Sequence, residues 1–331
     1  PAGFDGSMAF AVHGGVQVGT GRTLNHDHAL LWRGSATNFV DLHPPLPAYL
    51  DTVATGVSGA IQGGYAIQTI AEPDSIRAVM WRGTPGSMVD LHPPSKLGPG
   101  YIRPYIQTEV TGVSCHDLVG NGFVRTPAGN LGNAHALLWH GSATNYVDLN
   151  PTGFSWSYGR GISGNKQVGY GGATNEAFAQ VRALVWTGTP DSVVDLHQFL
   201  PAVSPAFQYS VATGIDEFGN IIGFAGLIIN PSPFQADNVQ AVLWIPDFEN
   251  GDMPRLSIAP WCLAGGQVKI QLHGEAGRSY AVEKSLDLLN WSGFLQTNIP
   301  NPVSYFRDWP TTDAPHGFYR ASIFNQPKTK D

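Results

Sequence analysis

Charge is scarce in this chain. Only 13% of its 331 residues are Asp, Glu, Lys or Arg, about half the fraction found in ordinary soluble domains. The net charge is −7 and no run of Lys or Arg offers a track for phosphates, so nucleic acid is not an expected partner. The sequence also lacks an apolar stretch of about eighteen residues, so no membrane span is expected.

Cysteine is scarce as well. The two cysteines, Cys115 and Cys262, cannot make a disulfide framework and leave room for one bridge or none. The chain begins with PAGFDG and shows no basic-then-apolar leader, so an export signal, if one was made, is expected to have been removed. Few cysteines and lysines beside abundant Gly, Asn, Thr and Trp are typical of secreted bacterial proteins.

Glycine and proline are abundant instead, with 40 and 25 residues, and hydrophobic residues make up 42% of the chain. No apolar period of 3.6 residues persists over a helix length. Short β-prone runs alternate with Gly, Asn, Ser and Pro, which is typical of strands and turns. The composition and the pattern together predict an all-β protein.

A sequence unit recurs five times in the first 260 residues. HALLWRG at 28–34 returns as RAVMWRG, HALLWHG, RALVWTG and QAVLWIP, with tryptophans at Trp32, Trp81, Trp139, Trp186 and Trp244. Nine residues after each of the first four tryptophans lies the aspartate of a VDL motif: Asp41, Asp90, Asp148 and Asp195. Two glycine-containing apolar segments precede each tryptophan, so each unit contains four short strands. Four strands repeated at roughly fifty residues are typical of a β-propeller blade.

The fold predicted from these repeats is a five-bladed β-propeller followed by a small β-sandwich. The propeller is expected over residues 1–260, with blades at about 6–50, 51–100, 101–152, 153–205 and 206–260, and the sandwich over 261–331. The tryptophan is expected to fill the wedge between blades and to hydrogen-bond its N–H. The VDL aspartate is expected to tie a strand end to backbone N–H groups. The fifth blade is expected to supply its own outer strand from DMPRLSI.

The segments GISGNKQVGYGG, HALLW and VDL resemble the extracellular HAF repeat found in many bacterial secreted proteins. The likeness covers roughly residues 6 to 260 and departs after DL, where HPP or NP replaces the usual glycine. It implies a secreted, propeller-like array and no particular activity. AGRSYAVEKSLDLLNW and HGFYRA resemble the Ig-like or fibronectin-like modules that close secreted proteins of environmental bacteria, which implies an anchoring or stabilising role for the C-terminal segment.

Long irregular loops are expected on one face of the propeller, where they lead into the inner strands. Loops on a rigid scaffold are where binding and catalysis concentrate. Aromatic residues stand just before or at the start of these strands, and a funnel of rings suits a sugar or an acyl chain. The predicted ligand-binding residues are Tyr49, Tyr105, Trp156, Tyr158, Phe207 and Tyr209. The alternative is that these rings only cap the core.

Two carboxylates, Asp51 and Glu109, are expected near the same rim. They could act as a general acid and base, or they could hold calcium, which takes six to eight oxygen ligands. His26 and His28 lie on one side of a strand and could contribute to a metal site. Against a metal role, Arg77, Arg182 and Gln240 replace His28 in other repeats, which favours hydrogen bonding or packing.

Two functions of different classes follow from this sequence. The first is an extracellular binding or scaffold protein that recognises a carbohydrate or another small ligand at the axial funnel. The alternative is a hydrolase of a glycoside, ester or lactone at the same mouth, assisted by calcium. No motif in the sequence decides whether the protein is an enzyme, and fold analogy alone does not supply a reaction.

Overall fold

The computed structural model describes residues 1–45, 49–68, 76–94, 105–126, 131–173, 181–201, 206–217, 219–231, 234–245, 255–259, 268–274, 276–286, 289–301, 303–308 and 318–323. These residues form β-strands and three short 3-10 turns, which confirms the all-β class. The chain divides into two compact units, Pro1–Ile245 and Pro246–Asp331. Each unit is described by itself.

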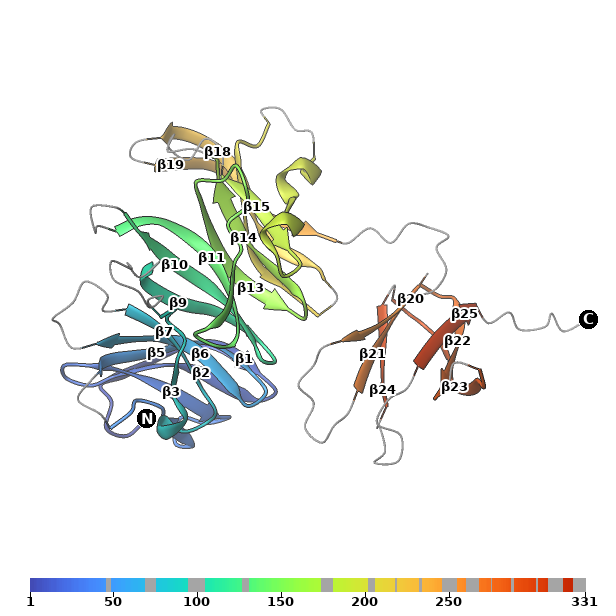
Figure 1. Cartoon of the computed structure of the whole chain (residues 1–331), viewed down its shortest axis with the longest axis horizontal. Helices are drawn as coiled ribbons and strands as arrows, with labels where there is room; N and C mark the ends of the chain where they lie inside the picture. Colours follow the sequence, from blue (N-terminus) through green and yellow to red (C-terminus); the bar gives the residue numbers. More distant parts are fainter. Residues whose placement is uncertain are drawn as a thin grey trace, which may run out of the picture. The chain divides into compact units, whose positions relative to one another are not determined.

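The N-terminal unit contains five antiparallel sheets in chain order, named here sheet one to sheet five (Figure 1). Sheets one to four have four strands each, and sheet five has three among the described residues. Sheet one contains β1 (Gly6–His13), β2 (Val16–Arg22), β3 (Asp27–Arg33) and β4 (Phe39–Asp41); sheet two contains β5 (Tyr49–Ser58), β6 (Ile61–Gln68), β7 (Ile76–Trp81) and β8 (Val89–Asp90). Sheet three contains β9 (Tyr105–Ser114), β10 (Asp117–Arg125), β11 (Leu131–Ser142) and β12 (Asn145–Asp148). Sheet four contains β13 (Trp156–Ser163), β14 (Lys166–Gly172), β15 (Arg182–Trp186) and β16 (Val194–Asp195); sheet five contains β17 (Tyr209–Ile215), β18 (Ile221–Pro231) and β19 (Phe234–Trp244).

Successive sheets pack face to face through apolar clusters. The first cluster joins Leu31 of sheet one to Val57 and Trp81 of sheet two, and equivalent clusters join sheets two to three, three to four and four to five. Each of these interfaces is called a joint below. In every joint the second sheet supplies the tryptophan, so the expectation that this ring fills the space between sheets is confirmed for Trp81, Trp139, Trp186 and Trp244.

The hydrogen bonding expected of the tryptophans is wrong for three of them. Trp244 donates its indole N–H to the carbonyl of Leu196 at 3.0 Å. Within 76–94, 131–173 and 181–201, by contrast, the indole nitrogens of Trp81, Trp139 and Trp186 are buried without a hydrogen-bond partner. The buried members of the clusters around these three rings are mainly aliphatic side chains, which offer no acceptor.

A left-handed turn joins the first two strands of each of the first four sheets. Its first residue is Gly14, Gly59, Cys115 or Gly164, with φ between 54° and 58°. This region favours glycine because a Cβ approaches the following carbonyl. Cys115 is the non-glycine residue with positive φ among the described residues, and it is half-buried. Cys262 lies outside the described residues.

Replacing this cysteine tests the strain in the turn. We expect Cys115→Gly to raise the free energy of unfolding by up to about 1 kcal/mol, because the left-handed penalty of about 1–2 kcal/mol is offset in part by the entropy of an added glycine. Cys115→Ala keeps the Cβ and serves as the control. Chemical denaturation of both variants checks the prediction, which fails if glycine is no more stable than alanine.

The C-terminal unit contains two three-stranded sheets. One consists of β20 (Arg255–Ala259), β21 (Val268–His273) and β24 (Val303–Asp308), and the other of β22 (Ser279–Ser285), β23 (Ser292–Asn298) and β25 (Phe318–Ile323). Leu272 and Phe306 of the first sheet share one cluster with Tyr280 and Val282 of the second, so the two sheets enclose a common core.

The outer strand expected for the fifth repeat belongs to this unit instead. Residues 255–259 form β20, which pairs with β21 from Arg255↔His273 to Ala259↔Lys269. The division between the units accordingly lies at 245/246, whereas the sequence placed it at 260/261. The fifth repeat has lost its VDL motif, and with it the aspartate and leucine that bind the outer strand in the other repeats.

Candidate functional site

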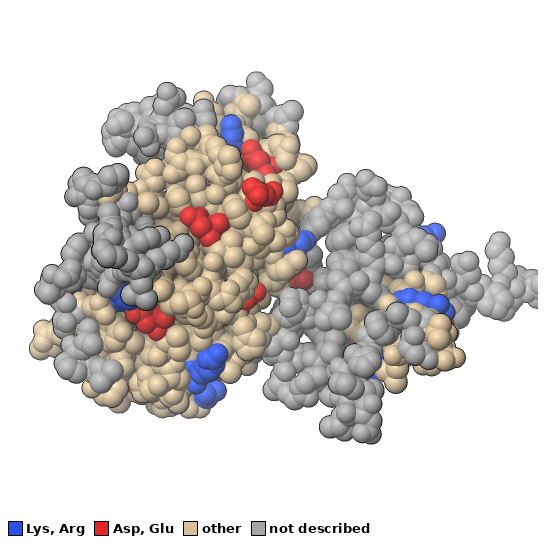
Figure 2. Space-filling model, viewed as in Figure 1, with Lys and Arg blue, Asp and Glu red and all other residues tan. Residues whose placement is uncertain are grey.

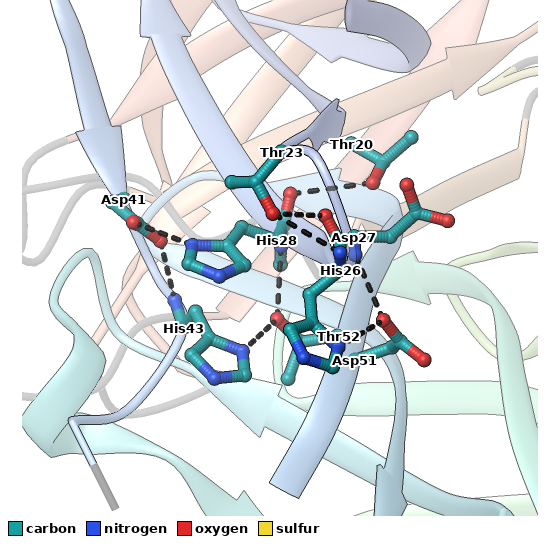
Figure 3. Close-up of polar contacts among 10 residues, drawn as sticks. Thr20, Thr23, His26, Asp27, His28, Asp41, His43, Asp51 and Thr52 are labelled. Carbon is teal, nitrogen blue, oxygen red and sulfur yellow. Dashed lines mark hydrogen bonds and ion pairs between the residues drawn. The ribbon is translucent and has the colours of Figure 1, made fainter. Parts of the chain in front are cut away.

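Three of the expected site residues, His26, His28 and Asp51, lie at the first joint (Figure 3). His28 Nδ1 lies 2.8 Å from Asp41 Oδ2, and the other oxygen of Asp41 accepts the backbone N–H of His43 at 2.9 Å. The rings of His28 and His43 stack with centroids 4.1 Å apart. His26 Nδ1 lies 3.5 Å from Asp51. The group is therefore two adjacent imidazole–carboxylate pairs.

The pair formed by His28 and Asp41 is a repeated structural contact. Arg77 donates to Asp90 at 2.6 Å and His135 lies 2.8 Å from Asp148, at the equivalent positions of sheets two and three. The aspartate also accepts the N–H two residues later in all four VDL motifs, which confirms the expectation for this residue. The replacement of histidine by arginine therefore conserves a side-chain contact between the third and fourth strands.

The residue after each VDL motif bonds to the next sheet across the joint. His43, His92 and His197 each place Nδ1 within 3.1 Å of a hydroxyl on the first strand of the following sheet, and Asn150 accepts the equivalent hydroxyl of Ser157. The same hydroxyls, on Thr52, Thr108, Ser157 and Ser210, accept the N–H of the alanine in the tryptophan motif. The repeated HALLW and VDLH motifs thus build the joints. The sequence analysis missed this link, although the recurrent Ser or Thr was visible.

Metal-binding geometry is not found among the residues that the structure describes. No group of three or more His, Cys, Asp or Glu side chains converges there. Of the expected metal candidates, His28 pairs with Asp41, His26 pairs with Asp51, and Glu109 accepts from Asn121 at 2.8 Å. The structure does not bring these four candidates together around one point.

Burial controls the protonation of the joint histidines. Burial lowers the pKa of His43, and His28 lowers it further against the opposing effect of Asp41 and Asp51. Burial and Arg182 likewise lower the pKa of His197, against the effect of Asp195. Burial alone would raise the pKa of Asp148, but the hydrogen bond and charge of His135 and further hydrogen bonds hold it below its ordinary value.

The lowered histidine pKa values predict a loss of stability in mild acid. Because the folded pKa lies below the ordinary value of 6.5, the unfolded chain binds more protons between the two values, and stability falls as pH falls through this window. Thermal unfolding of the N-terminal unit between pH 7.5 and 5 should show this decline. In the double variant His43→Gln, His197→Gln the decline should be shallower. An equal slope in both proteins contradicts the prediction.

Three of the six expected ligand aromatics lie in the core. Tyr105, Phe207 and Tyr209 are buried, and the hydroxyl of Tyr105 donates to Asp148 at 2.9 Å. Burial, with the nearby Asp148 carboxylate, raises the pKa of Tyr105. Tyr49 is half-buried and packs against the first joint. For these four residues the alternative given in the sequence analysis, capping of the core, matches the structure.

The burial of Tyr49, Tyr105 and Phe207 follows from a position that is aromatic in every repeat. This position lies five residues before the equivalent strand residues Ala9, Ala54, Val110, Gly159 and Ala212. Phe4, Tyr49, Tyr105, Phe154 and Phe207 occupy the position. In sheet three the Tyr105 ring lies where a Cβ on Gly122 would be, and Phe4 packs over Gly21 in the same way. A residue type that recurs in every sheet with the same contact is part of the scaffold. The five-fold recurrence was the signal in the sequence that could have shown this.

Trp156 and Tyr158, the remaining two, belong to a cluster that occurs in sheet four. Tyr158 and Tyr170 are cross-strand partners whose rings stack 5.2 Å apart at 19°. Trp156 meets both rings edge-on at 6.0 Å. The Arg160 guanidinium lies 5.7 and 5.3 Å from the two tyrosine centroids and donates to the Tyr170 hydroxyl at 2.8 Å. All three rings are partly exposed. These four residues are called the aromatic cluster below.

The positions of the aromatic cluster vary between repeats. Met8, Val53, Glu109 and Val211 stand where Tyr158 does, and Phe10, Thr55, Thr111 and Thr213 stand where Arg160 does. The common fold therefore does not depend on a tyrosine pair or an arginine here, although Trp156 and Tyr170 also pack against a buried cluster that contains Tyr209. Trp156 and Tyr158 were predicted because they stand beside the loop that leads into β13, whereas Arg160 lies farther along β13 and Tyr170 lies on β14.

A polar pair lies next to the aromatic cluster on sheet three. Asn121, which is fully buried, donates to Glu109 at 2.8 Å and accepts the N–H of Gly159 at 2.9 Å. Phe123 meets the Tyr158 ring edge-on at 6.3 Å. The pair therefore fixes a carboxylate beside the aromatic rings and connects sheet three to sheet four.

Charge is sparse on one face of the described structure. On the face shown in Figure 2 the described surface consists mainly of uncharged residues, with isolated acidic and basic side chains. None of the described helical segments has the length and hydropathy of a membrane-spanning helix.

Comparison with known proteins gives little to build on. No protein-family model matches the chain, and no curated protein matches it. Among solved structures, a glycoside hydrolase is similar over 97% of this chain and 94% of its own, with a TM-score of 0.28 and 8% identity. An exo-β-1,3-galactanase from Phanerochaete chrysosporium, solved with β-1,3-galactotriose, is similar over 91% and 88%, with a TM-score of 0.30 and 9% identity. Likenesses this weak carry no argument about the site.

Proposed function

We propose that the protein is an extracellular carbohydrate-binding scaffold of the β-propeller type, with the aromatic cluster of sheet four as its ligand contact. The five sheets act as blades of an arc that is open between sheet five and sheet one, where Leu243 and Val12 are exposed. The C-terminal pair of sheets acts as a small sandwich-like module. The resemblance of the repeats to the HAF repeat supports the extracellular location. The observation that carries the binding role is the stacked pair of Tyr158 and Tyr170 under Arg160.

The chemistry of the aromatic cluster suits a sugar. Aromatic rings offer an apolar, electron-rich surface to the C–H face of a pyranose, and their polar atoms remain available at the edges. Arg160 supplies N–H donors, and Glu109 supplies an acceptor that Asn121 holds in place. A few oriented polar groups around an apolar surface are the usual composition of a small-molecule site.

The test is a binding measurement on polysaccharides. The purified chain is run through gels containing laminarin, xylan or pectic galactan, and the retained polysaccharide is titrated by calorimetry. Tyr158→Ala should weaken binding at least about tenfold, equivalent to about 1.4 kcal/mol. Phe199→Ala removes an exposed ring (63% exposed) outside the cluster and should bind as the unaltered chain does. Retention of none of the polysaccharides, or equal affinity in both variants, contradicts the proposal.

Hydrolysis is the second candidate, and one observation favours it. Hydrogen bonds hold both expected catalytic carboxylates in place: Asp51 accepts the backbone N–H of Asp27 at 2.8 Å, and Glu109 accepts from Asn121 at 2.8 Å. Incubating the same chain with nitrophenyl glycosides, esters and lactones, with and without calcium, separates the two functions. Turnover that is lost in Glu109→Gln supports a hydrolase, whereas binding without turnover leaves the scaffold role.

A further inference from the structure

The two ends of the five-sheet stack expose residues whose equivalents at the internal joints are buried or half-buried. Val12 of β1 is 68% exposed, although its equivalent in sheet two, Val57, is 7% exposed because it packs on sheet one. Leu243 of β19 is 55% exposed, although its equivalents Leu31 and Leu138 are 1% exposed because the next sheet covers them. In Figure 1 sheets one and five lie at opposite ends of the stack.

The end sheets also contain residues equivalent to the donors and acceptors that form hydrogen bonds across the internal joints. In all four joints the alanine of the tryptophan motif donates its N–H to a hydroxyl of the next sheet, at 2.9 to 3.0 Å. Continuing the series beyond sheet five gives Ala241 as donor, and the position equivalent to the acceptor in sheet one is Ser7. Both residues are exposed.

A second hydrogen bond continues in the same way. Thr55 and Thr111 donate across their joints to the carbonyls of Val110 and Gly159, and each also bonds within its own sheet. Thr213 of sheet five makes the equivalent bond within its sheet, to Ile222 at 3.2 Å. The equivalent of Val110 and Gly159 in sheet one is Ala9, whose strand is exposed.

The turn between β1 and β2 of sheet one also contains a backbone N–H group equivalent to a donor of the internal joints. The N–H groups of Gly59, Cys115 and Gly164 donate to His13, Ser58 and Ser114 of the preceding sheet, from left-handed turns. Gly14 has the same left-handed conformation, with φ of 57°. Its counterpart on sheet five is Asp216, a carboxylate that can accept several hydrogen bonds.

We propose that the protein associates head to tail, with sheet five of one copy packed on sheet one of a second copy as a further joint. The joint would bury Val12 and Leu243, and it would form the bonds from Ala241 to Ser7 and from Thr213 to Ala9. A second copy is the expected occupant of each end face because it continues the series of joints. The residues that would follow sheet five in this series are those of sheet one, which a second copy supplies. Such a heterologous contact produces rings or filaments.

The test uses two variants, each of which damages one end. Analytical ultracentrifugation of the full chain should show assemblies whose mass rises with concentration. Val12→Glu and Leu243→Glu should each abolish assembly, because a charge is placed in an apolar joint. Mixed in equal amounts, the two variants should form a two-chain species and nothing larger, because one intact face of each kind remains. Leu24→Glu, at an exposed leucine outside the joint positions, is the control and should assemble normally.

A chain that stays monomeric at all concentrations overturns the proposal, and it points to closure of sheet one on sheet five within one copy. A mixture of the two variants that stays monomeric overturns it too. Should either charged variant fail to fold, oxidative coupling replaces it: Ser7→Cys and Ala241→Cys, on separate chains lacking Cys115 and Cys262, should couple when mixed. The absence of that disulfide is equally decisive, because residues bonded in this way lie at disulfide distance.

Discussion

Trp139→Ala should destabilise the N-terminal unit by about 3–5 kcal/mol, the range observed when a fully buried large aromatic is truncated. The Trp139 side chain is completely buried in the joint between sheets two and three, against Met80, Leu118 and Leu137. Both sheets lose contacts when the ring is removed, and strands cannot close the gap without breaking their ladders. Urea denaturation followed by tryptophan fluorescence and circular dichroism measures the loss.

Trp139→Phe separates the size of this ring from its N–H group. The indole N–H of Trp139 has no hydrogen-bond partner within the described residues. Phenylalanine therefore removes volume but no hydrogen bond, and it should lower the free energy of unfolding clearly less than alanine does. Leu131→Ala truncates an exposed side chain (51% exposed) on the same strand and should change stability by less than about 0.5 kcal/mol. Equal losses for alanine and phenylalanine would mean that the N–H carries the stability.

The repeat was predictable from sequence because every sheet must solve the same packing problem. A large ring at the joint, a small residue on the inner strand and an aspartate at the end of the outer strand recur at fixed spacing, as Trp81 and Asp90 illustrate. The strands therefore lie close to where the spacing predicted them. The fifth outer strand was mistaken because Arg255–Ala259 has the length and polarity of such a strand, and only its pairing with β21 shows where it belongs.

The candidate site was harder to predict. Within a single repeat, a residue that recurs in all repeats cannot be told from one that occurs in that repeat alone. Tyr105 and Tyr158 both stand at the start of a first strand, yet one is buried over Gly122 and the other is partly exposed in the aromatic cluster. The difference depends on which side of the strand each side chain faces, and a bulge in the first strand shifts that register. Tyr170 joins the cluster only through its cross-strand pairing with Tyr158, and Arg160 joins it from a bulge in β13; the sequence specifies neither feature.

The joints also show how one repeat can tolerate different residues at its polar positions. The hydroxyl is threonine in sheets two and three and serine in sheets four and five, and its partner is histidine or asparagine. What persists is a hydroxyl that accepts one backbone N–H and bonds one side chain. Removing this hydroxyl should therefore lower the stability of the protein more than exchanging threonine for serine does.

Thr108→Val tests this requirement at the most buried joint. The Thr108 hydroxyl accepts the N–H of Ala78 at 2.9 Å and lies 2.8 Å from His92 Nδ1, and all three residues are buried. Valine has nearly the same shape, so packing is preserved while the Ala78 N–H loses its acceptor and the His92 ring loses a contact. At about 1–3 kcal/mol for each of these two interactions lost, the expected loss is about 2–6 kcal/mol.

Thr108→Ser is the matched control, because the chain itself uses serine at the equivalent Ser157 and Ser210. It keeps the hydroxyl and removes one methyl group, which costs about 1 kcal/mol. A third variant, Thr37→Val, removes an exposed hydroxyl from a turn and should be nearly neutral. If Thr108→Val were as stable as Thr108→Ser, the hydrogen bonds of the joint would contribute nothing net, and the sheets would be held together by their apolar faces alone.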